Sequence, residues 1–189
     1  MAGFSKISMV STFTMNKPTR NTDKQPLLSE ISRKRKLDLF TKYLRPNAMV
    51  LEVGAGTGWF TRRLRDRGFQ AVSLDLVGPA DIVGDINHWR DLNLSPQSFD
   101  AVVALEVIEH VDCLDSLRSL CKQGGLIMLS SPHPRWDRVM RVLEHARLTQ
   151  MRTSEHRNLT EFRNIPLPVV LLRRPMWIHQ VAIFRDEHC

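Results

Sequence analysis

The chain has 189 residues, of which 42% are apolar, and its formal net charge is +7. This length and this apolar content fit one globular domain with its own core. No run of about 18 apolar residues occurs, which predicts no membrane-spanning helix, and the first residues lack the compact apolar stretch of a secretory signal. A basic chain can bind nucleic acid or other anions, but charge alone does not require such a partner.

The basic residues and the cysteines give two further expectations. Basic residues gather in short clusters, which we interpret as solvated helix faces. These clusters are Arg33 to Lys36, Arg62 with Arg63, and Arg173 with Arg174. The three cysteines, Cys113, Cys121 and Cys189, have neither the number nor the spacing typical of a disulfide framework or a zinc site. They therefore predict the reducing cytoplasm as the location of the chain.

Regular elements are predicted from residue 29 onward, after a polar, aperiodic tail over residues 1–28. From Ser29 to Leu44 the apolar residues follow helical spacing, and Pro46 with Asn47 ends that helix. Strands and helices then alternate along the chain. The expected strands are 49–53, 70–76, 81–83, 101–105, 126–130 and 176–184, the last paired with a strand near 169–172. The expected helices are 59–67 (capped by Gly68), 87–94, 112–122 and 134–148.

The fold class follows from the composition of the strands. Strands 49–53, 101–105 and 126–130 are nearly continuous apolar runs, which is typical of parallel strands covered on both faces by helices. Their alternation with helices predicts a single α/β domain over residues 29–189, with an open, doubly wound sheet. Ligands of such folds bind outside the carboxyl ends of the strands. We therefore expect functional residues at the ends of the first, second and fourth strands.

The segment Glu52-Val53-Gly54-Ala55-Gly56-Thr57-Gly58 lies directly after the first strand and directly before a helix. Its glycines allow a tight turn and the close approach of a ligand. The following helix offers free N–H groups to an anion. The segment is not a P-loop, because no Gly-Lys-Ser/Thr follows, and it departs from the Gly-x-Gly-x-x-Gly spacing of dinucleotide binders. The alternative interpretation is a generic glycine-rich turn.

Acidic residues follow the next three strands. Asp75 ends the second strand, where a carboxylate can accept hydrogen bonds from both hydroxyls of a ribose. Asp85 and Ile86 come after the short third strand and suit the amine and the ring of an adenine, although Asp85 is also a typical helix N-cap. The fourth strand ends in Leu105-Glu106-Val107-Ile108-Glu109-His110-Val111. Two acids and an imidazole are therefore expected at the same edge of the sheet.

Taken together, these motifs resemble those of class I S-adenosyl-L-methionine (SAM)-dependent methyltransferases. The resemblance rests on residues 52–58, Asp75, Gly84-Asp85-Ile86 and residues 99–111, in that order along the chain. It is nearest to the small type 11 group, similar to the ubiquinone-biosynthesis O-methyltransferases, and Gly124 to Pro132 resembles the fifth strand of that group. One departure is that only five residues separate Asp75 from Asp81, so the usual helix between strands two and three is nearly absent.

The resemblance implies a Rossmann-like, seven-stranded sheet that is mostly parallel, with a reversed C-terminal strand. It also implies a SAM site, which becomes a site for the product S-adenosyl-L-homocysteine (SAH) after transfer. In that site Asp75, followed by Leu76, holds the ribose, and Asp85 with Ile86 meets the adenine. The other implied contacts are to the methionine part of SAM, and they come from Glu52, Gly54, Ala55, Gly56, Gly58, Leu105 and Glu106.

Methyl transfer from a sulfonium is an in-line displacement, so the protein must align the acceptor and exclude water. A hydroxyl acceptor also needs a base within hydrogen-bond reach, and His110 and His133 are the candidates. The favoured interpretation has no metal. The alternative rests on Glu106-x-x-Glu109-His110, which resembles a metal-binding run of small-RNA 2′-O-methyltransferases and would share one face of a helical turn. With His156, this set would suit Mg²⁺, Mn²⁺ or Zn²⁺.

The acceptor is the least determined part of the prediction. Residues 132–175 are expected to form a substrate cap that combines apolar anchors with arginines. The anchors are Trp136, Met140, Leu143 and Phe162, and the arginines are Arg135, Arg138, Arg141, Arg147, Arg152 and Arg157. These arginines could bind an anionic small molecule or could form a solvated helix face. The favoured function is methyl transfer to a small-molecule acceptor at oxygen. The alternatives are an RNA methyltransferase and a non-catalytic SAM-binding protein.

Overall fold

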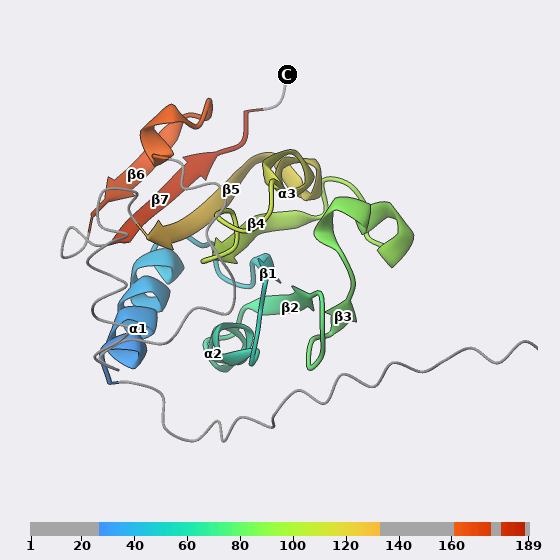
Figure 1. Ribbon diagram of the computed structural model, residues 1–189, viewed down its shortest axis with the longest axis horizontal. Helices are drawn as coiled ribbons and strands as arrows, with labels where there is room; N and C mark the ends of the chain where they lie inside the picture. The colour runs from blue at the N-terminus through green and yellow to red at the C-terminus, as the bar shows by residue number, and fades with distance from the viewer. Residues whose placement is uncertain (1–26, 133–160, 175–178, 188–189) are drawn as a thin grey trace, which may run out of the picture.

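The computed structural model describes residues 27–132, 161–174 and 179–187. These residues form a seven-stranded sheet with the order β3-β2-β1-β4-β5-β7-β6 (Figure 1). The strands are β1 (Met49–Val53), β2 (Gln70–Asp75), β3 (Ile82–Val83), β4 (Phe99–Leu105), β5 (Cys121–Pro132), β6 (Val169–Arg173) and β7 (His179–Arg185). Strand β7 is antiparallel to both of its neighbours, β5 and β6, and the pairs among β1 to β5 are parallel. The predicted fold class, with its reversed C-terminal strand, is confirmed.

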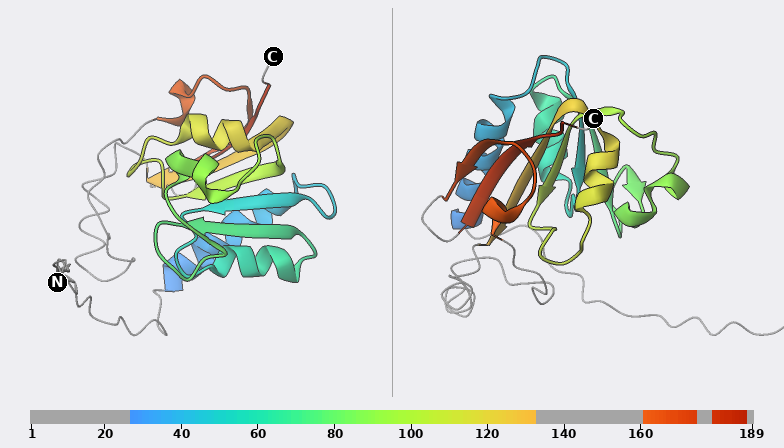
Figure 2. Two further views of the ribbon diagram at one scale, coloured as in Figure 1. Left: turned by 90° about the vertical axis from the view of Figure 1, so that its right-hand side faces the viewer. Right: turned by 90° about the horizontal axis from the view of Figure 1, so that it is seen from above.

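Helices cover both faces of this sheet. They are α1 (Leu27–Thr41), α2 (Trp59–Asp66) and α3 (Leu114–Leu120), together with the short 3-10 helices η1 (Ile86–Leu92) and η3 (Phe162–Asn164). Helices α1 and α2 lie on one side of the sheet and α3 on the other (Figure 2). Among the described residues, no helix combines the length and the apolar character that crossing a membrane would need.

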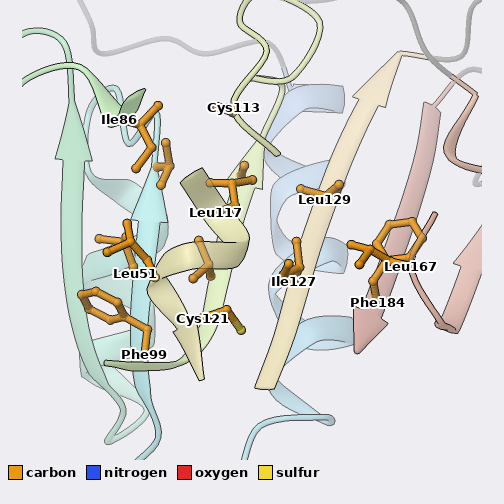
Figure 3. Packing of buried hydrophobic residues seen from close by; sticks show 14 of the residues in the cluster. Leu51, Ile86, Phe99, Cys113, Leu117, Cys121, Ile127, Leu129, Leu167 and Phe184 are labelled. Atoms are coloured by element: carbon orange, nitrogen blue, oxygen red, sulfur yellow. The ribbon is translucent and has the colours of Figure 1, made fainter. Parts of the chain in front are cut away.

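Each face of the sheet has its own apolar core, because successive residues of a strand point to opposite faces. Leu51 of β1 packs in the core beneath α3, where it joins Leu117 (Figure 3). Its neighbour Val50 packs in the core beneath α1 and α2, where it joins Phe40 and Leu64. The central strands are therefore buried on both faces, which is the physical reason for their continuous apolar runs.

Several boundaries differ from the predicted ones. Helix α1 begins at Leu27, inside the predicted tail, and ends at Thr41, where the Tyr43 N–H donates to the Phe40 carbonyl in a tighter turn (3.0 Å). Strand β5 begins at Cys121 and not at residue 126, so α3 is shorter than the predicted helix over 112–122. The predicted helix over 87–94 is the 3-10 helix η1. Gly68 follows α2 with φ +84, as a C-terminal cap requires.

The described part of the predicted cap belongs to the main domain. Phe162 is fully buried in the core beneath α3, beside Phe184 at 6.4 Å between ring centroids. Residues 169–173 form the edge strand β6, which pairs with β7, so the strand predicted near 169–172 is confirmed. The expected helix over 134–148, together with His133 and His156, lies outside the described residues. So do residues 1–26 and Cys189, whereas Cys113 and Cys121 are buried free thiols.

Candidate functional site

The loop between β1 and α2 turns on three glycines whose backbones are left-handed. Their φ angles are +72 at Gly54, +55 at Gly56 and +68 at Gly58. A Cβ atom at Gly54 would lie only 2.3 Å from Cγ2 of Val107, which follows β4. The Gly54 N–H donates to the carbonyl of Leu74 in β2 (2.8 Å). Gly54 therefore allows both the turn and the close packing of this loop against the ends of two neighbouring strands.

Asp75 ends β2 beside this loop, and two backbone amides orient its carboxylate. The Gly56 N–H donates to Oδ2 (2.7 Å) and the Val77 N–H donates to Oδ1 (3.2 Å). Each oxygen keeps a lone pair for another donor. Leu76 and Val77 are 69% and 63% exposed, and Val83, the register partner of Asp75 in β3, is 54% exposed. An oriented carboxylate beside exposed apolar side chains fits a ribose joined to a flat ring.

Glu52, in β1, lies beneath the loop and is only 4% exposed. Its Oε2 accepts a hydrogen bond from the Thr61 N–H (2.8 Å) and another from the Thr61 hydroxyl. Glu52 thus satisfies a free N–H in the first turn of α2. Burial raises the pKa of the Glu52 carboxyl to about 7, although the Thr61 hydrogen bonds and the charge of Arg33 act in the opposite direction. Ala55, in the same loop, is also buried.

The raised pKa of Glu52 predicts how stability depends on pH. Between pH 4.5 and about 7 the folded chain keeps a proton on Glu52 that the unfolded chain has lost, so the free energy of unfolding falls as pH rises through this window. The loss from this group is at most about 3 kcal/mol. Glu52→Gln, whose carbonyl oxygen still accepts from Thr61, should flatten this part of the profile. Urea unfolding at pH 5 and pH 8 measures the effect.

The control for that measurement is Glu30→Gln, because Glu30 is exposed at the start of α1. This variant should keep the pH dependence of the unmodified chain. If Glu52→Gln loses as much stability between pH 5 and pH 8 as the unmodified chain does, Glu52 does not hold the extra proton.

Asp85 and Ile86 lie where β3 leads into η1. The Asp85 carboxylate accepts a hydrogen bond from the Asn87 N–H (2.9 Å), so its expected role as an N-cap is confirmed. The Ile86 side chain is 4% exposed and packs in the core beneath α3. Contacts of these two residues with an adenine stay a prediction.

Glu106 lies directly after β4, and a cluster of polar side chains surrounds it. Its φ is +57, and its N–H donates to the carbonyl of Ser130 in β5 (2.8 Å). Its Oε1 accepts from Nζ of Lys36 (2.5 Å) and from the Ser130 hydroxyl (2.8 Å), and Nδ1 of His179 lies 3.6 Å away. Burial alone would raise the pKa of Glu106, but Lys36 and His179 hold it well below its usual range. Glu106 is therefore an ionised carboxylate in a network that joins α1, β5 and β7.

Glu109 and His110 lie on the turn that follows Glu106. The His110 N–H donates to the Val107 carbonyl (2.8 Å), so the turn begins after Glu106, whose own backbone is left-handed. The expectation that Glu106, Glu109 and His110 share one helical face is therefore wrong. Glu109 is fully buried, and its carboxyl oxygens have no hydrogen-bond partner among the described residues. Burial, together with the charge of Glu106, raises its pKa to about 8. Within the described ranges, no group of three or more His, Cys, Asp or Glu residues could hold a metal ion.

Three members of the Glu106 network, Lys36, Ser130 and His179, were not predicted as site residues from the sequence. Lys36 belongs to a basic cluster that we expected on a solvated helix face, but it is only 7% exposed. Lys36 lies next to the buried Leu37 and four residues before the buried Phe40, which places it on the inner side of α1. This spacing could have indicated that the Lys36 side chain is buried. His179 had no local signal, because strand pairing brings it to Glu106 from the end of the chain. Leu105, a predicted site residue, packs against the core beneath α1 and α2.

Known proteins resemble this chain both in sequence and in fold. A family model described as a methyltransferase domain matches residues 26–167. The ubiquinone biosynthesis O-methyltransferase of Xanthomonas campestris pv. campestris (strain B100) is 33% identical over an alignment of 104 residues that covers 46% of this chain and 44% of that protein. The match therefore spans less than half the length of this curated relative.

Two solved structures are similar to this chain in fold. The PH0226 protein from Pyrococcus horikoshii OT3 superposes with a TM-score of 0.65 at 18% identity, over 86% of this chain and 92% of that one. The second structure is described as concerning the conversion of a disulfide bond into a thioacetal group during echinomycin biosynthesis. It superposes with a TM-score of 0.56 at 19% identity, over 81% of each chain. At these identities the likeness is one of fold. Because the family model covers most of the sequence, the chain belongs to the methyltransferase domain family, with the class I fold of the SAM-dependent enzymes.

Proposed function

We propose that the chain transfers the methyl group of SAM to an oxygen atom of a small-molecule acceptor and releases SAH. The observation that carries this proposal is the Asp75 carboxylate, which two amides orient at the carboxyl edge of β2. Vicinal ribose hydroxyls are suitable donors to such a carboxylate, and the exposed Leu76 and Val77 offer apolar surface for the adenine. Transfer to oxygen is supported by the name of the ubiquinone biosynthesis O-methyltransferase, which matches part of the chain.

Within this proposal, each segment of the site has a separate task. SAM, when bound, supplies an electrophilic methyl group on a sulfonium. The loop over residues 52–58 approaches its amino-acid part, and Leu105 with Glu106 lines the same edge at the end of β4. Asp85 and Ile86 contact the adenine, Asp85 at its amine and Ile86 at its ring. The chain thereby holds the donor in one orientation at the edge of the sheet, so that an acceptor can meet the methyl group in line.

A small acceptor is favoured over RNA by the ion pairs of α2. Arg65 pairs with Asp81 at 2.6 Å. Arg67 pairs with Asp38 at 2.5 Å. A carboxylate paired with an arginine neutralises its positive charge. Less positive charge is then available to contact phosphates, and RNA affinity depends on such contacts. Within the basic cluster itself, Arg63 pairs with Asp66 at 3.3 Å. The basic residues of α2 and of its C-cap Arg67 are therefore weaker support for RNA binding than the sequence suggests.

His110 is proposed as the base that takes the proton of the acceptor hydroxyl, with His133 as the other candidate. His110 is half-buried and lies on the turn after β4, at the same edge as Asp75. His110→Gln should lower kcat by at least about 100-fold while SAH affinity stays within about twofold, because a general base contributes roughly 10²- to 10⁴-fold. The assay follows SAH release from SAM with a panel of hydroxyl probes: catechol, phenol and an aliphatic alcohol.

Two outcomes of that assay would contradict the proposal. Loss of activity in His133→Gln, with His110→Gln unaffected, would move the role of base to His133. A chain that binds SAH but methylates amine or thiol probes and none of the hydroxyl probes would contradict transfer to oxygen.

A further inference from the structure

The Glu-x-x-Glu-His run after β4 is where the alternative interpretation of the sequence would place a divalent metal, but the structure already places a cation of the chain there. We propose that the ammonium group of Lys36 is a built-in cation at this edge and occupies the position that a divalent metal would take at the Glu106 carboxylate. This inference rests on the proposed function, because that proposal identifies this edge of the sheet as the functional site. The contacts of Lys36 that support the inference do not depend on methyl transfer.

The ammonium group of Lys36 contacts two oxygen atoms that could otherwise bind a metal ion. Its Nζ lies 2.5 Å from Oε1 of Glu106 and 3.0 Å from Oγ of Ser130. Metal ions bind carboxylate and hydroxyl oxygens at about 2.0–2.6 Å, so an ion on Oε1 would overlap the ammonium group or be strongly repelled by it. Lys36 is 7% exposed, and its own helix holds it in place through Leu37 and Phe40. The ammonium group of Lys36 therefore takes the place of a metal ion at Oε1 of Glu106 while α1 is docked.

The charges around Lys36 agree with this interpretation. Arg33 lies one helical turn before Lys36, and its charge acts on both Glu52 and Glu106. The charge of Lys36 acts on Glu109 as well as on Glu106. Helix α1 thus supplies two cations to the acidic residues at the ends of β1 and β4. No further cation is needed to compensate Glu106.

A consequence is that α1 belongs to the functional site. Glu106 holds a left-handed φ of +57, which a residue with a side chain adopts only when its surroundings enforce it. The enforcing contacts are the Ser130 carbonyl on its N–H and the Lys36 ammonium on its carboxylate. Lys36 is therefore a positioning residue, which fixes Glu106 at the edge where Asp75 and the glycine loop also lie.

The test is to remove the ammonium group and titrate the full chain with Mn²⁺, with free Mn²⁺ followed by electron paramagnetic resonance. Lys36→Ala frees Oε1 of Glu106, with the Ser130 hydroxyl at 2.8 Å and Nδ1 of His179 at 3.6 Å as further ligands. This variant should bind one Mn²⁺ at least tenfold more tightly than the unmodified chain, and the added change Glu106→Gln should abolish that site. Lys34→Ala, an exposed neighbour on α1, should behave like the unmodified chain. Circular dichroism checks that each variant is folded, and Lys36→Ser replaces Lys36→Ala if the alanine variant does not fold.

Two results would overturn the inference. One is an unmodified chain that binds Mn²⁺ as tightly as Lys36→Ala does and loses that binding in Glu106→Gln. The other is a folded Lys36 variant that gains no Mn²⁺ site. SAH titration of the same proteins separates this inference from the proposed function. Absence of SAH binding to the unmodified chain would contradict the methyltransferase proposal, whereas the Mn²⁺ result would still decide the role of Lys36.

Discussion

Gly54→Ala should abolish measurable SAH binding and lower the free energy of unfolding by about 2–5 kcal/mol. The backbone of Gly54 is left-handed, with φ +72, which costs a residue with a side chain about 1–2 kcal/mol. The added Cβ would also lie 2.3 Å from Cγ2 of Val107, and overpacking of this kind costs about 1–3 kcal/mol. The loop must therefore shift away from the ends of β2 and β4. Urea unfolding and SAH titration calorimetry measure the two effects.

Gly68→Ala separates backbone strain from the clash. Gly68 is also left-handed, with φ +84, but a Cβ there would have no atom within 4 Å, and it lies at the other end of α2. This variant should lose about 1–2 kcal/mol of stability and keep full SAH affinity. Adding Val107→Ala to Gly54→Ala removes the clashing methyl groups and should recover part of the SAH binding. A Gly54→Ala chain with unchanged SAH affinity would show that the loop does not contact the ligand.

Asp75→Ala should weaken SAH binding by about 100-fold or more. Hydrogen bonds to a charged group contribute about 1.5–3 kcal/mol each, and two ribose hydroxyls can donate to this carboxylate. Each 1.4 kcal/mol corresponds to about tenfold in affinity. The Gly56 N–H also donates to Asp75, so the variant loosens the loop as well. Asp75→Asn, which keeps one acceptor oxygen, should lose less affinity. Titration calorimetry with SAH measures both variants.

The matched control is Asp66→Ala. Asp66 is an exposed carboxylate on α2 that pairs with Arg63 at 3.3 Å, a surface contact worth little. It should leave SAH affinity within about twofold of the unmodified chain. Equal SAH affinities in Asp75→Ala and Asp66→Ala would contradict the assignment of Asp75 to the ribose.

The sequence predicted those parts of the molecule that local patterns determine. Continuous apolar runs identified the central strands, because burial on both faces demands them. Glycines at strand ends identified the loop over residues 52–58, and Asp75 was placed correctly at the end of β2. The extension of β5 back to Cys121 was missed, because it depends on pairing with Phe99 across an irregular register. Such pairing has no signature in the β5 segment itself.

Long-range contacts account for the rest of what was missed in the site. Lys36 lies in a run of four basic residues, and composition alone favours solvent for such a run. Its burial follows from the docking of α1, which brings it to Glu106, 70 positions along the chain. The left-handed φ of Glu106 removed it from the predicted helical face. Sequence periodicity indicates which side of a helix or strand is buried, but it does not indicate which polar side chain from another element contacts that side.

A crystal structure of the full chain with SAH tests the central proposal most directly. The proposal predicts that both ribose hydroxyls donate to Asp75, that the adenine lies against Leu76 and Val77, and that the sulfur faces the end of β4 beside Glu106. SAH that is bound away from Asp75 and the glycine loop, or that is absent from the crystal at saturating concentration, would contradict it.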